Sequence, residues 1–358
     1  MQKIKELIIG DLVAKVPIIQ GGMGVAISLS GLASAVANQG GIGVIAVAGV
    51  GLKEPDLFTD YIGANNRALR EELRKAKRMT KGIIGVNIMI ALSNYKEMMQ
   101  VSIEEGVDII FSGAGLPLNM PEYLPEHGHH PKLVPIVSSG KAAGLIARRW
   151  TEKFNYLPDA IVVEGPKAGG HLGFKRENLN DENFKLETIL EDVIKAIKPY
   201  EQKYGKKIPV IAAGGIYTGH DIFEIMKLGA SGVQMATRFV TTHECDAADD
   251  FKKAYTRAKS DDILIINSPV GMPGRAIRNQ FIVDVNSGNK KPFKCPYHCI
   301  ITCDYKTAPY CIALALFNAK NGDMENGFAF AGENASRTSE IVSVKELMDE
   351  LVSEYENS

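Results

Sequence analysis

Residues 160–174 read AIVVEGPKAGGHLGF, an apolar run followed by a group of glycines around one histidine. The β-branched run from Ala160 to Val163 is typical of one buried parallel strand. Glycines on either side of His171 allow backbone conformations with positive φ and let a flat ligand approach closely. Neutral imidazole can take or give a proton near pH 7. A single histidine is more often structural, but its place at the end of a buried strand favours a catalytic or ligand-facing role.

Eight such apolar runs, this one included, recur along the first two-thirds of the chain, with amphipathic segments between them. Val/Ile-rich runs that alternate with helices indicate a parallel sheet covered by crossover helices. Eight strand–helix units in about 250 residues predict an α/β fold, namely a (β/α)8 TIM barrel. A doubly wound open sheet is the alternative, but residues 21–24 after the first run lack the Gly-x-Gly-x-x-Gly fingerprint that would favour it.

These patterns also predict the element bounds and the domains. The predicted strands cover residues 16–20, 43–47, 84–88, 108–112, 133–138, 161–164, 209–213 and 232–237. The predicted helices cover residues 30–38, 57–78, 93–105, 140–154, 184–204, 219–228 and 247–259. We expect a barrel over residues 1–260, a smaller Cys-rich lid domain over 261–335, and a C-terminal helix within 336–358 that packs back on the barrel. The helical spacing of that last segment is equally compatible with a homodimer contact.

Composition excludes several classes of partner. The chain has 358 residues and a formal net charge of −1, which gives no electrostatic footprint for nucleic acid or an anionic membrane. No apolar run is long enough to span a membrane, and residues 1–7 carry no signal-peptide core. We therefore expect a cytoplasmic protein that acts on a small molecule, without nucleic-acid or membrane partners.

The ends of the last two predicted strands indicate a phosphate site. One strand ends in Ala213-Gly214-Gly215, and the other ends in Ala236-Thr237. In such barrels the loops after strands seven and eight commonly bind phosphate through backbone N–H groups. The alternative is a glycine cap after one strand and an ordinary polar end of the other. This alternative explains less well why both features occur together at the last two strands.

Taken in order, five stretches resemble the FMN-dependent nitronate monooxygenase family, formerly called 2-nitropropane dioxygenase, which includes the flavoprotein enoyl-ACP reductases. The resemblance is collinear over about residues 12–280 and continues through Gly274-Arg275-Ala276-Ile277-Arg278-Asn279. The stretches are residues 17–23, 85–89, 164–173, 209–216 and 234–239.

The resemblance implies an FMN in the barrel mouth and a role for each matching residue. The isoalloxazine would lie against Gly22 and Met23, with Asn87 near its edge, and His171 matches the family's catalytic histidine. The phosphate would be held by the main chain at Gly214, Gly215, Ala236 and Thr237. The remaining residues assigned to the cofactor site are Glu164, Gly169, Gly170, Ala213, Gln234 and Met235.

Two reactions fit these residues equally well. A nitronate monooxygenase oxidises small alkyl nitronates with O2, and His171 would orient the nitro oxygens or move a proton. An NAD(P)H-dependent reductase would act on an enoyl thioester or a quinone with the same FMN and histidine, and would have acyl carrier protein as a partner in the first case. A flavin-binding protein without turnover is the third reading.

Two segments depart from the family pattern. Residues 117–131 are a Pro-rich insertion that holds His127, His129 and His130, and we interpret it as a lid segment beside the pocket or a solvated loop rather than a metal site.

The second departure places four cysteines within seventeen residues, Cys295, Cys299, Cys303 and Cys311. They could ligate an iron–sulfur cluster or Zn²⁺. On a straight helix the first and third would lie about 12 Å apart, too far to share one metal. The alternative is a reduced, Cys-rich helix packed over the pocket.

Overall fold

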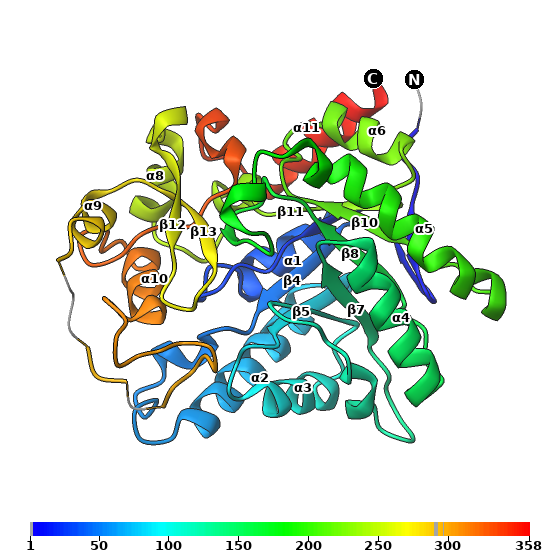
Figure 1. Ribbon diagram of the computed structural model, residues 1–358, viewed down its shortest axis with the longest axis horizontal. Coiled ribbons are helices and arrows are strands. Elements are labelled where there is room, and N and C mark those ends of the chain that lie inside the picture. The colour runs from blue at the N-terminus through cyan, green and yellow to red at the C-terminus, as the bar shows by residue number, and fades with distance from the viewer. Residues whose placement is uncertain (1–2, 290–292, 296) are drawn as a thin grey trace.

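The protein is described from a computed structural model that covers residues 3–289, 293–295 and 297–358 (Figure 1). Eight parallel strands close into a barrel in the order β10-β11-β3-β4-β5-β6-β7-β8. The predicted (β/α)8 barrel is confirmed, and the open sheet is wrong. The barrel strands are β3 (Ile18–Gln20), β4 (Ile42–Ala46), β5 (Ile83–Met89), β6 (Ile109–Gly113), β7 (Lys132–Val137), β8 (Ile161–Glu164), β10 (Val210–Ala213) and β11 (Gly232–Met235).

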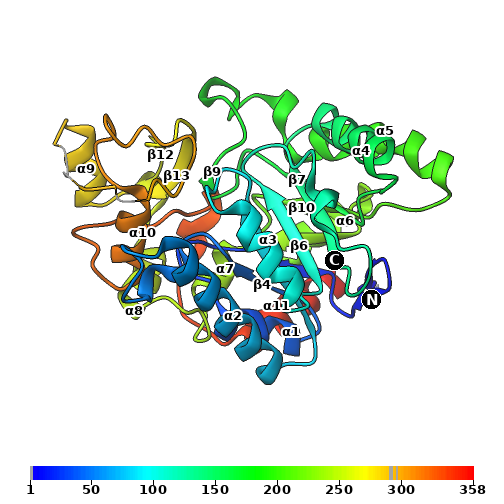
Figure 2. The ribbon, with the colours of Figure 1, turned by 90° about the horizontal axis from the view of Figure 1, so that it is seen from below.

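Helices surround the barrel and cover its strands (Figures 1 and 2). In α4 the Ser139 hydroxyl accepts a hydrogen bond from the Ala142 N–H at 3.2 Å, which caps the helix, and Ile146 and Trp150 are buried. The predicted helices are found with small shifts at their ends. The last predicted strand is shorter than expected because Thr237 begins α7 instead. The surrounding helices are α1 (Ser30–Asn38), α2 (Tyr61–Met79), α3 (Tyr95–Glu104), α4 (Gly140–Phe154), α5 (Leu186–Tyr204), α6 (Gly219–Lys227) and α7 (Thr237–Val240). α8 (Asp249–Arg257) lies beside the C-terminal part, where it contacts residues 333–337 (Figure 1).

Two apolar clusters form the core. One fills the barrel interior and contains Val44, Phe111 and Val162, whereas the other lies between the strands and the helices. The antiparallel hairpin of β1 (Leu7–Ile9) and β2 (Leu12–Ala14), which the sequence did not predict, adds Leu7 and Ile9 to the interior cluster. Leu7 lies beside Gly232 at the start of β11, so the hairpin packs at the amino ends of the strands.

The C-terminal part adds a second sheet at the other end of the barrel. Strands β12 (Ile263–Asn267) and β13 (Pro273–Ile277) pair with each other, and β13 also pairs with β9 (Gly170–His171) from the β8–α5 connection. α9 (Gln280–Asn286) and α10 (Ile312–Lys320) follow. α11 (Val344–Glu356) packs against α1 and α6, and its start is capped by Ser343 and Glu346. The predicted domain boundaries stay predictions.

Short 3-10 turns complete the architecture, and within the described residues no helix combines the length and apolar character needed to cross a membrane. The prediction about the N-terminal segment includes Met1 and Gln2, which lie outside the described residues. The 3-10 turns are η1 (Val50–Lys53), η2 (Met120–Tyr123), η3 (Arg176–Asn178), η4 (Glu182–Phe184), η5 (Ser260–Asp262) and η6 (Glu333–Arg337).

Candidate active site

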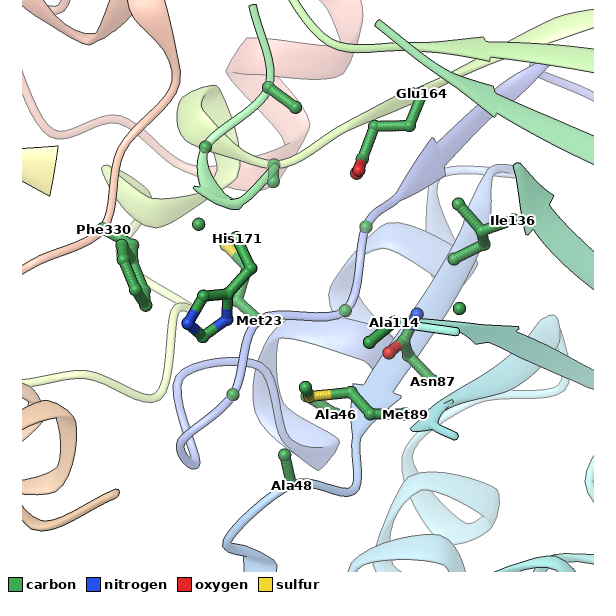
Figure 3. A pocket seen from close by; sticks show the side chains of 18 of the residues that line it. Met23, Ala46, Ala48, Asn87, Met89, Ala114, Ile136, Glu164, His171 and Phe330 are labelled. Carbon is green, nitrogen blue, oxygen red and sulfur yellow. The ribbon is translucent and has the colours of Figure 1, made fainter. Parts of the chain in front are cut away.

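A cavity of about 720 Å³ lies at the carboxyl ends of the barrel strands, where barrel enzymes place their active sites (Figure 3). Every residue that the sequence assigned to catalysis or to the cofactor lines it. The structure therefore brings the predicted site together, while the role of each residue stays a prediction. These residues are Gly22, Met23, Asn87, Glu164, Gly169, Gly170, His171, Ala213, Gly214, Gly215, Gln234, Met235, Ala236 and Thr237.

His171 is held from the C-terminal sheet. It lies opposite Gly274 in the β9–β13 pairing, and its Nε2 is 2.7 Å from the Ser268 hydroxyl. The Phe330 ring packs edge-on against the imidazole, with the ring centroids 5.0 Å apart. Figure 3 shows the imidazole projecting into the cavity between Phe330 and Met23. Two side chains thus fix the orientation of the ring.

The environment keeps this imidazole neutral. Burial lowers the pKa of His171 to about 4. The Ser268 hydroxyl also accepts a hydrogen bond from the Val270 N–H at 3.4 Å, which holds it beside Nε2 of the histidine. In the tautomer in which the hydroxyl donates to Nε2, the ring proton resides on Nδ1, which has no partner among the described residues and can donate to a ligand.

Glu164 points into the same cavity from the end of β8 (Figure 3). Its carboxyl group forms no hydrogen bond or ion pair with any described residue, and burial raises its pKa to about 7. Such a group is neutral in part of the molecules at neutral pH. It can therefore donate or accept a hydrogen bond at a ligand hydroxyl or amide.

Backbone N–H groups without partners lie on the β10–β11 side of the cavity. Those of Gly214, Gly215, Ala236 and Thr237 have no hydrogen-bond acceptor among the described residues. Gly214 and Gly215 adopt φ values of 91° and 92°, which place them in the region that favours glycine. The Asn334 side chain donates to the Gly215 carbonyl at 2.6 Å and fixes this loop. The arrangement fits an anion, as the phosphate hypothesis requires.

The main chain after β3 comes unusually close to the barrel side chains. A Cβ atom at Gly22 would lie 2.5 Å from Cβ of Asn87, so only glycine fits there. The next residue, Met23, donates its N–H to the Ser28 hydroxyl at 2.9 Å. Gly22, Met23 and Asn87 all face the cavity, and they leave room for a flat ring against the backbone.

Arg275 anchors the loop that carries His171. Its buried guanidinium donates to the carbonyls of Pro166 and Ala168 at 2.7 and 2.6 Å, and it pairs with Glu333 at 3.4 Å. The sequence singled out residues 274–279 without giving Arg275 a role. Ser268 and Phe330 were missed altogether, because neither belongs to a recognisable motif and both meet His171 only in the fold.

The cysteine-rich segment is not helical. Described residues between 293 and 311 form turns and one isolated bridge, so the predicted Cys-rich helix is wrong. Cys299 lines the cavity, whereas the other three cysteines of this segment do not. Within residues 3–289, 293–295 and 297–358, no group of three or more His, Cys, Asp or Glu side chains is arranged to hold a metal ion. The zinc or iron–sulfur hypothesis stays a prediction.

The histidines of the insertion lie far from the cavity. His129 meets the carbonyl of Val107 at 2.6 Å and lies just before β7 begins, at the amino ends of the strands. His127 and His130 are exposed there as well. These three histidines therefore do not belong to a lid over the pocket, and their exposure agrees with the other interpretation, a solvated loop.

Comparison with known proteins identifies the family of the chain. The family model described as "Nitronate monooxygenase" matches residues 5–354. A probable nitronate monooxygenase of Staphylococcus saprophyticus is 29% identical over 79% of this chain and 81% of its own length. A (3aS,4S,5R,7aS)-5-hydroxy-7a-methyl-1-oxo-octahydro-1H-indene-4-carboxyl-CoA dehydrogenase of Mycobacterium tuberculosis is 29% identical over 76% of this chain. The match spans just under two thirds of that relative, 66%.

Solved structures agree in fold. FabK from Thermotoga maritima superposes with a TM-score of 0.74 at 28% sequence identity, covering 96% of this chain and 93% of that one. A nitroalkane oxidase from Streptomyces ansochromogenes gives a TM-score of 0.72 at 21% identity and covers 96% of both chains, which is a likeness of fold.

Proposed function

Because this chain belongs to the nitronate monooxygenase family, we propose that it is an FMN-dependent oxidoreductase that oxidises small alkyl nitronates with O2. The family assignment makes the chain an oxidoreductase. The finer proposal depends on one observation: the cavity joins a neutral histidine to a set of unpartnered backbone N–H groups suited to a phosphate.

The cavity residues fit FMN. Gly214, Gly215, Ala236 and Thr237 would hold its phosphate, and Gly22 would lie against its ring system. The side chains of Met23, Asn87, Glu164, Gln234 and Met235 and the small residues Gly169, Gly170 and Ala213 would complete the site. When bound, FMN supplies the capacity to accept electrons from the substrate and to pass them to oxygen.

His171 suits an anionic substrate that has already lost its proton. A nitronate carries its negative charge on the nitro oxygens, and Nδ1–H of the neutral imidazole can donate to one of them. A base with a pKa near 4 removes protons poorly at neutral pH, so orientation of the substrate is its main task. Ser268 and Phe330 keep the ring turned towards the substrate while this happens.

The alternative is an NAD(P)H-dependent reductase of an enoyl thioester or a quinone, with the same FMN and His171. The similarity to FabK over 96% of the chain favours it. In that reaction Nδ1–H would donate to the thioester carbonyl oxygen and withdraw electron density from the double bond. A flavin-binding protein without turnover is the remaining reading.

Rapid mixing of the purified yellow protein separates these readings. Under anaerobic conditions we expect propyl-2-nitronate to bleach the flavin absorbance and NADH or NADPH to leave it unchanged, with colour returning when oxygen is admitted. Bleaching by a nicotinamide alone would establish the reductase instead. No bleaching by either would indicate a binding protein, and a colourless protein that takes up no FMN would refute all three.

A further inference from the structure

The four cysteines that depart from the family pattern come together in the structure. Each of these thiols interacts electrostatically with the other three, so the sulfur atoms share one region of the fold. All of them are free thiols, and the proposed flavin chemistry gives them no role. We call them the four-cysteine group, which consists of Cys295, Cys299, Cys303 and Cys311.

Turns bring the four-cysteine group together. The Cys303 N–H donates to the Ile300 carbonyl at 3.1 Å, which reverses the chain between two of the cysteines. In a second turn the Ala308 N–H donates to the Asp304 carbonyl at 2.9 Å, and the chain then returns to Cys311 at the start of α10. The separation of about 12 Å that a straight helix would impose on the first and third cysteines therefore does not apply.

The segment that carries the group is anchored to the barrel. Leu92, which follows β5, forms an antiparallel bridge with Ile300. The Ser93 N–H donates to the Cys299 carbonyl at 3.1 Å. Backbone contacts with the barrel thus fix the path of the chain on both sides of Cys299, and the sulfurs are held in a defined arrangement.

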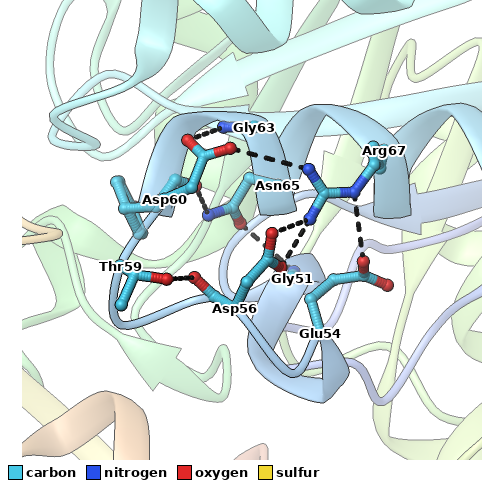
Figure 4. Close-up of polar contacts among 9 residues, drawn as sticks. Gly51, Glu54, Asp56, Thr59, Asp60, Gly63, Asn65 and Arg67 are labelled. Atoms are coloured by element: carbon cyan, nitrogen blue, oxygen red, sulfur yellow. Dashed lines mark hydrogen bonds and ion pairs between the residues drawn. The ribbon is translucent and has the colours of Figure 1, made fainter.

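The segment before α2 provides a second anchor (Figure 4). Arg67 on α2 holds carboxylates of this segment, with its Nε 3.4 Å from Glu54 and its Nη1 3.6 Å from Asp60. The Tyr61 ring, at the start of α2, stacks on the Tyr297 ring with centroids 4.3 Å apart and an interplanar angle of 9°. Tyr297 interacts electrostatically with three of the four cysteines. The ring pair therefore adds an apolar wall beside the group, and such a shell limits the access of solvent to a metal site.

The arrangement suits a cluster better than a single ion. A Zn–S bond is about 2.3 Å long, so the sulfurs around one Zn²⁺ lie about 4 Å apart. Among the residues that the structure describes, no three donor side chains are arranged to hold such an ion. In an iron–sulfur cluster the cysteines bind different iron atoms, so their sulfurs lie farther apart. His298 adds no ligand, because its Nε2 lies 2.9 Å from the Cys303 carbonyl.

Two members of the group connect it to other parts of the fold. Cys311 directly precedes the first turn of α10, where the N–H groups of a helix start favour a thiolate. Cys299 lines the cavity that also contains His171. A group bound by the four cysteines would therefore lie against the cavity wall.

We propose that the four-cysteine group binds an iron–sulfur cluster through four thiolates. Each thiol releases its proton to solvent and forms one Fe–S bond to a cluster supplied ready-made, so the protein is neither oxidised nor reduced in this step. Such a cluster supplies one-electron transfer at the edge of the cavity. The proposal goes beyond the proposed function and does not depend on it.

Metal analysis of the full chain tests the proposal. The protein is produced with ample iron and purified without oxygen, and iron, acid-labile sulfide and zinc are measured per chain. We expect about two to four iron atoms with an equal amount of sulfide, the range for clusters with four cysteine ligands, and no stoichiometric zinc. Protein that holds zinc instead would overturn the proposal. So would iron-free protein that takes up no cluster from ferrous iron and sulfide under anaerobic conditions.

Single substitutions localise the cluster. Cys303→Ala and Cys311→Ala each remove one ligand and should lower the iron content at least about tenfold. Cys245→Ala is the control, because this fifth cysteine is buried elsewhere, with its sulfur 3.6 Å from the Ile27 carbonyl, and it should keep the wild-type iron content. The emission of Trp150, the single tryptophan and fully buried, reports folding without the flavin. Wild-type iron content in both variants of the group would refute the assignment.

The same measurements separate this proposal from the proposed function. Iron and sulfide are counted again after FMN has been removed, and a paramagnetic signal that appears on reduction of the flavin-free protein must come from the cluster. Cluster binding by protein that oxidises no nitronate would support the proposal and count against the proposed function. Nitronate oxidation by iron-free protein that cannot be reconstituted would overturn the proposal and leave the proposed function intact.

Discussion

At the scale of single residues, His171 is the group on which the proposed chemistry depends. We predict that His171→Ala retains bound FMN but loses about 10²- to 10⁴-fold in kcat/KM, because an oriented donor or acid–base group contributes a factor of that size. Steady-state kinetics together with the flavin spectrum check this. His220→Ala, an exposed histidine beside the C-terminus, is the matched control and should behave as wild type. Wild-type activity in His171→Ala would remove the imidazole from the mechanism.

Ser268 acts through the imidazole rather than on the substrate. In Ser268→Ala the Nε2 atom loses its 2.7 Å partner, so the ring can adopt the other tautomer and other orientations. We expect kcat to fall about tenfold with KM nearly unchanged, since loss of one hydrogen bond of this kind costs about 1.4 kcal/mol. Ser260→Ala, on the exposed turn η5, supplies the control. A pH profile that is identical in Ser268→Ala and wild type, with equal kcat, would contradict the positioning role.

Glu164 makes stability depend on pH in a direction that can be worked out. Its pKa is raised to about 7 in the folded state from 4.5, so the folded state binds more protons between these values and its stability falls as pH rises through them. His171, with its pKa lowered from 6.5 to about 4, contributes the opposite slope between about pH 4 and 6.5. Only a comparison of wild type with a variant at Glu164 therefore isolates the contribution of this carboxyl group to the pH dependence of stability.

We predict that Glu164→Gln raises the melting temperature of the flavin-free protein at pH 8 relative to wild type, and that the difference shrinks towards pH 5. At about 1–2 °C per kcal/mol for a chain of this length, the shift is measurable by calorimetry. Glu224→Gln, an exposed glutamate on α6, should show no such pH-dependent difference. A lower melting temperature of Glu164→Gln at pH 8 would show that the carboxylate is stabilised in the fold.

At the scale of elements, the glycine after β3 is a more critical position than a glycine within a helix. Gly22→Ala puts a methyl group 2.5 Å from Cβ of Asn87, so the strand end or Asn87 must move. We expect at least a tenfold loss of FMN affinity, measured by fluorescence titration. Gly144→Ala in α4 is the control, because its new methyl group meets only Ala196 at an ordinary 3.8 Å, and it should be neutral or stabilising by up to about 1 kcal/mol. Equal FMN affinity in wild type and Gly22→Ala would contradict the close approach of the ring.

The sequence predicts elements well where a long periodic pattern exists. The eight barrel strands and the long helices follow from apolar runs and amphipathic spacing, because burial on two faces of a strand or one face of a helix imposes those periods. The two-residue strand β9 and the β1–β2 hairpin have no such period, and tertiary pairing alone creates them. The same holds at the site. Glycine-rich strand ends could be recognised from the sequence. The contact of Ser268 with His171 could not be predicted, because the two residues are 97 positions apart in the sequence.

At the scale of the whole molecule, the barrel supplies the loops proposed to hold the cofactor, and the C-terminal part supplies the partners of the histidine. Arg275 and Ser268, both beyond the last barrel strand, hold the loop and the ring from one side. The lid was expected from the break in strand–helix alternation, but its strand pairing with residues 170–171 was not, because a cross-strand register over this distance leaves no local trace in the sequence.

The pairing of β9 with β13 also orders events in time. The barrel strands leave the ribosome before residues 273–277 do. The barrel of a newly made chain can therefore close while His171 still lacks its pairing with β13. Competence for turnover would arrive only when the last third of the polypeptide has emerged and docked. The loops after the barrel strands and the strand pairing that positions the imidazole are therefore completed at different moments of synthesis.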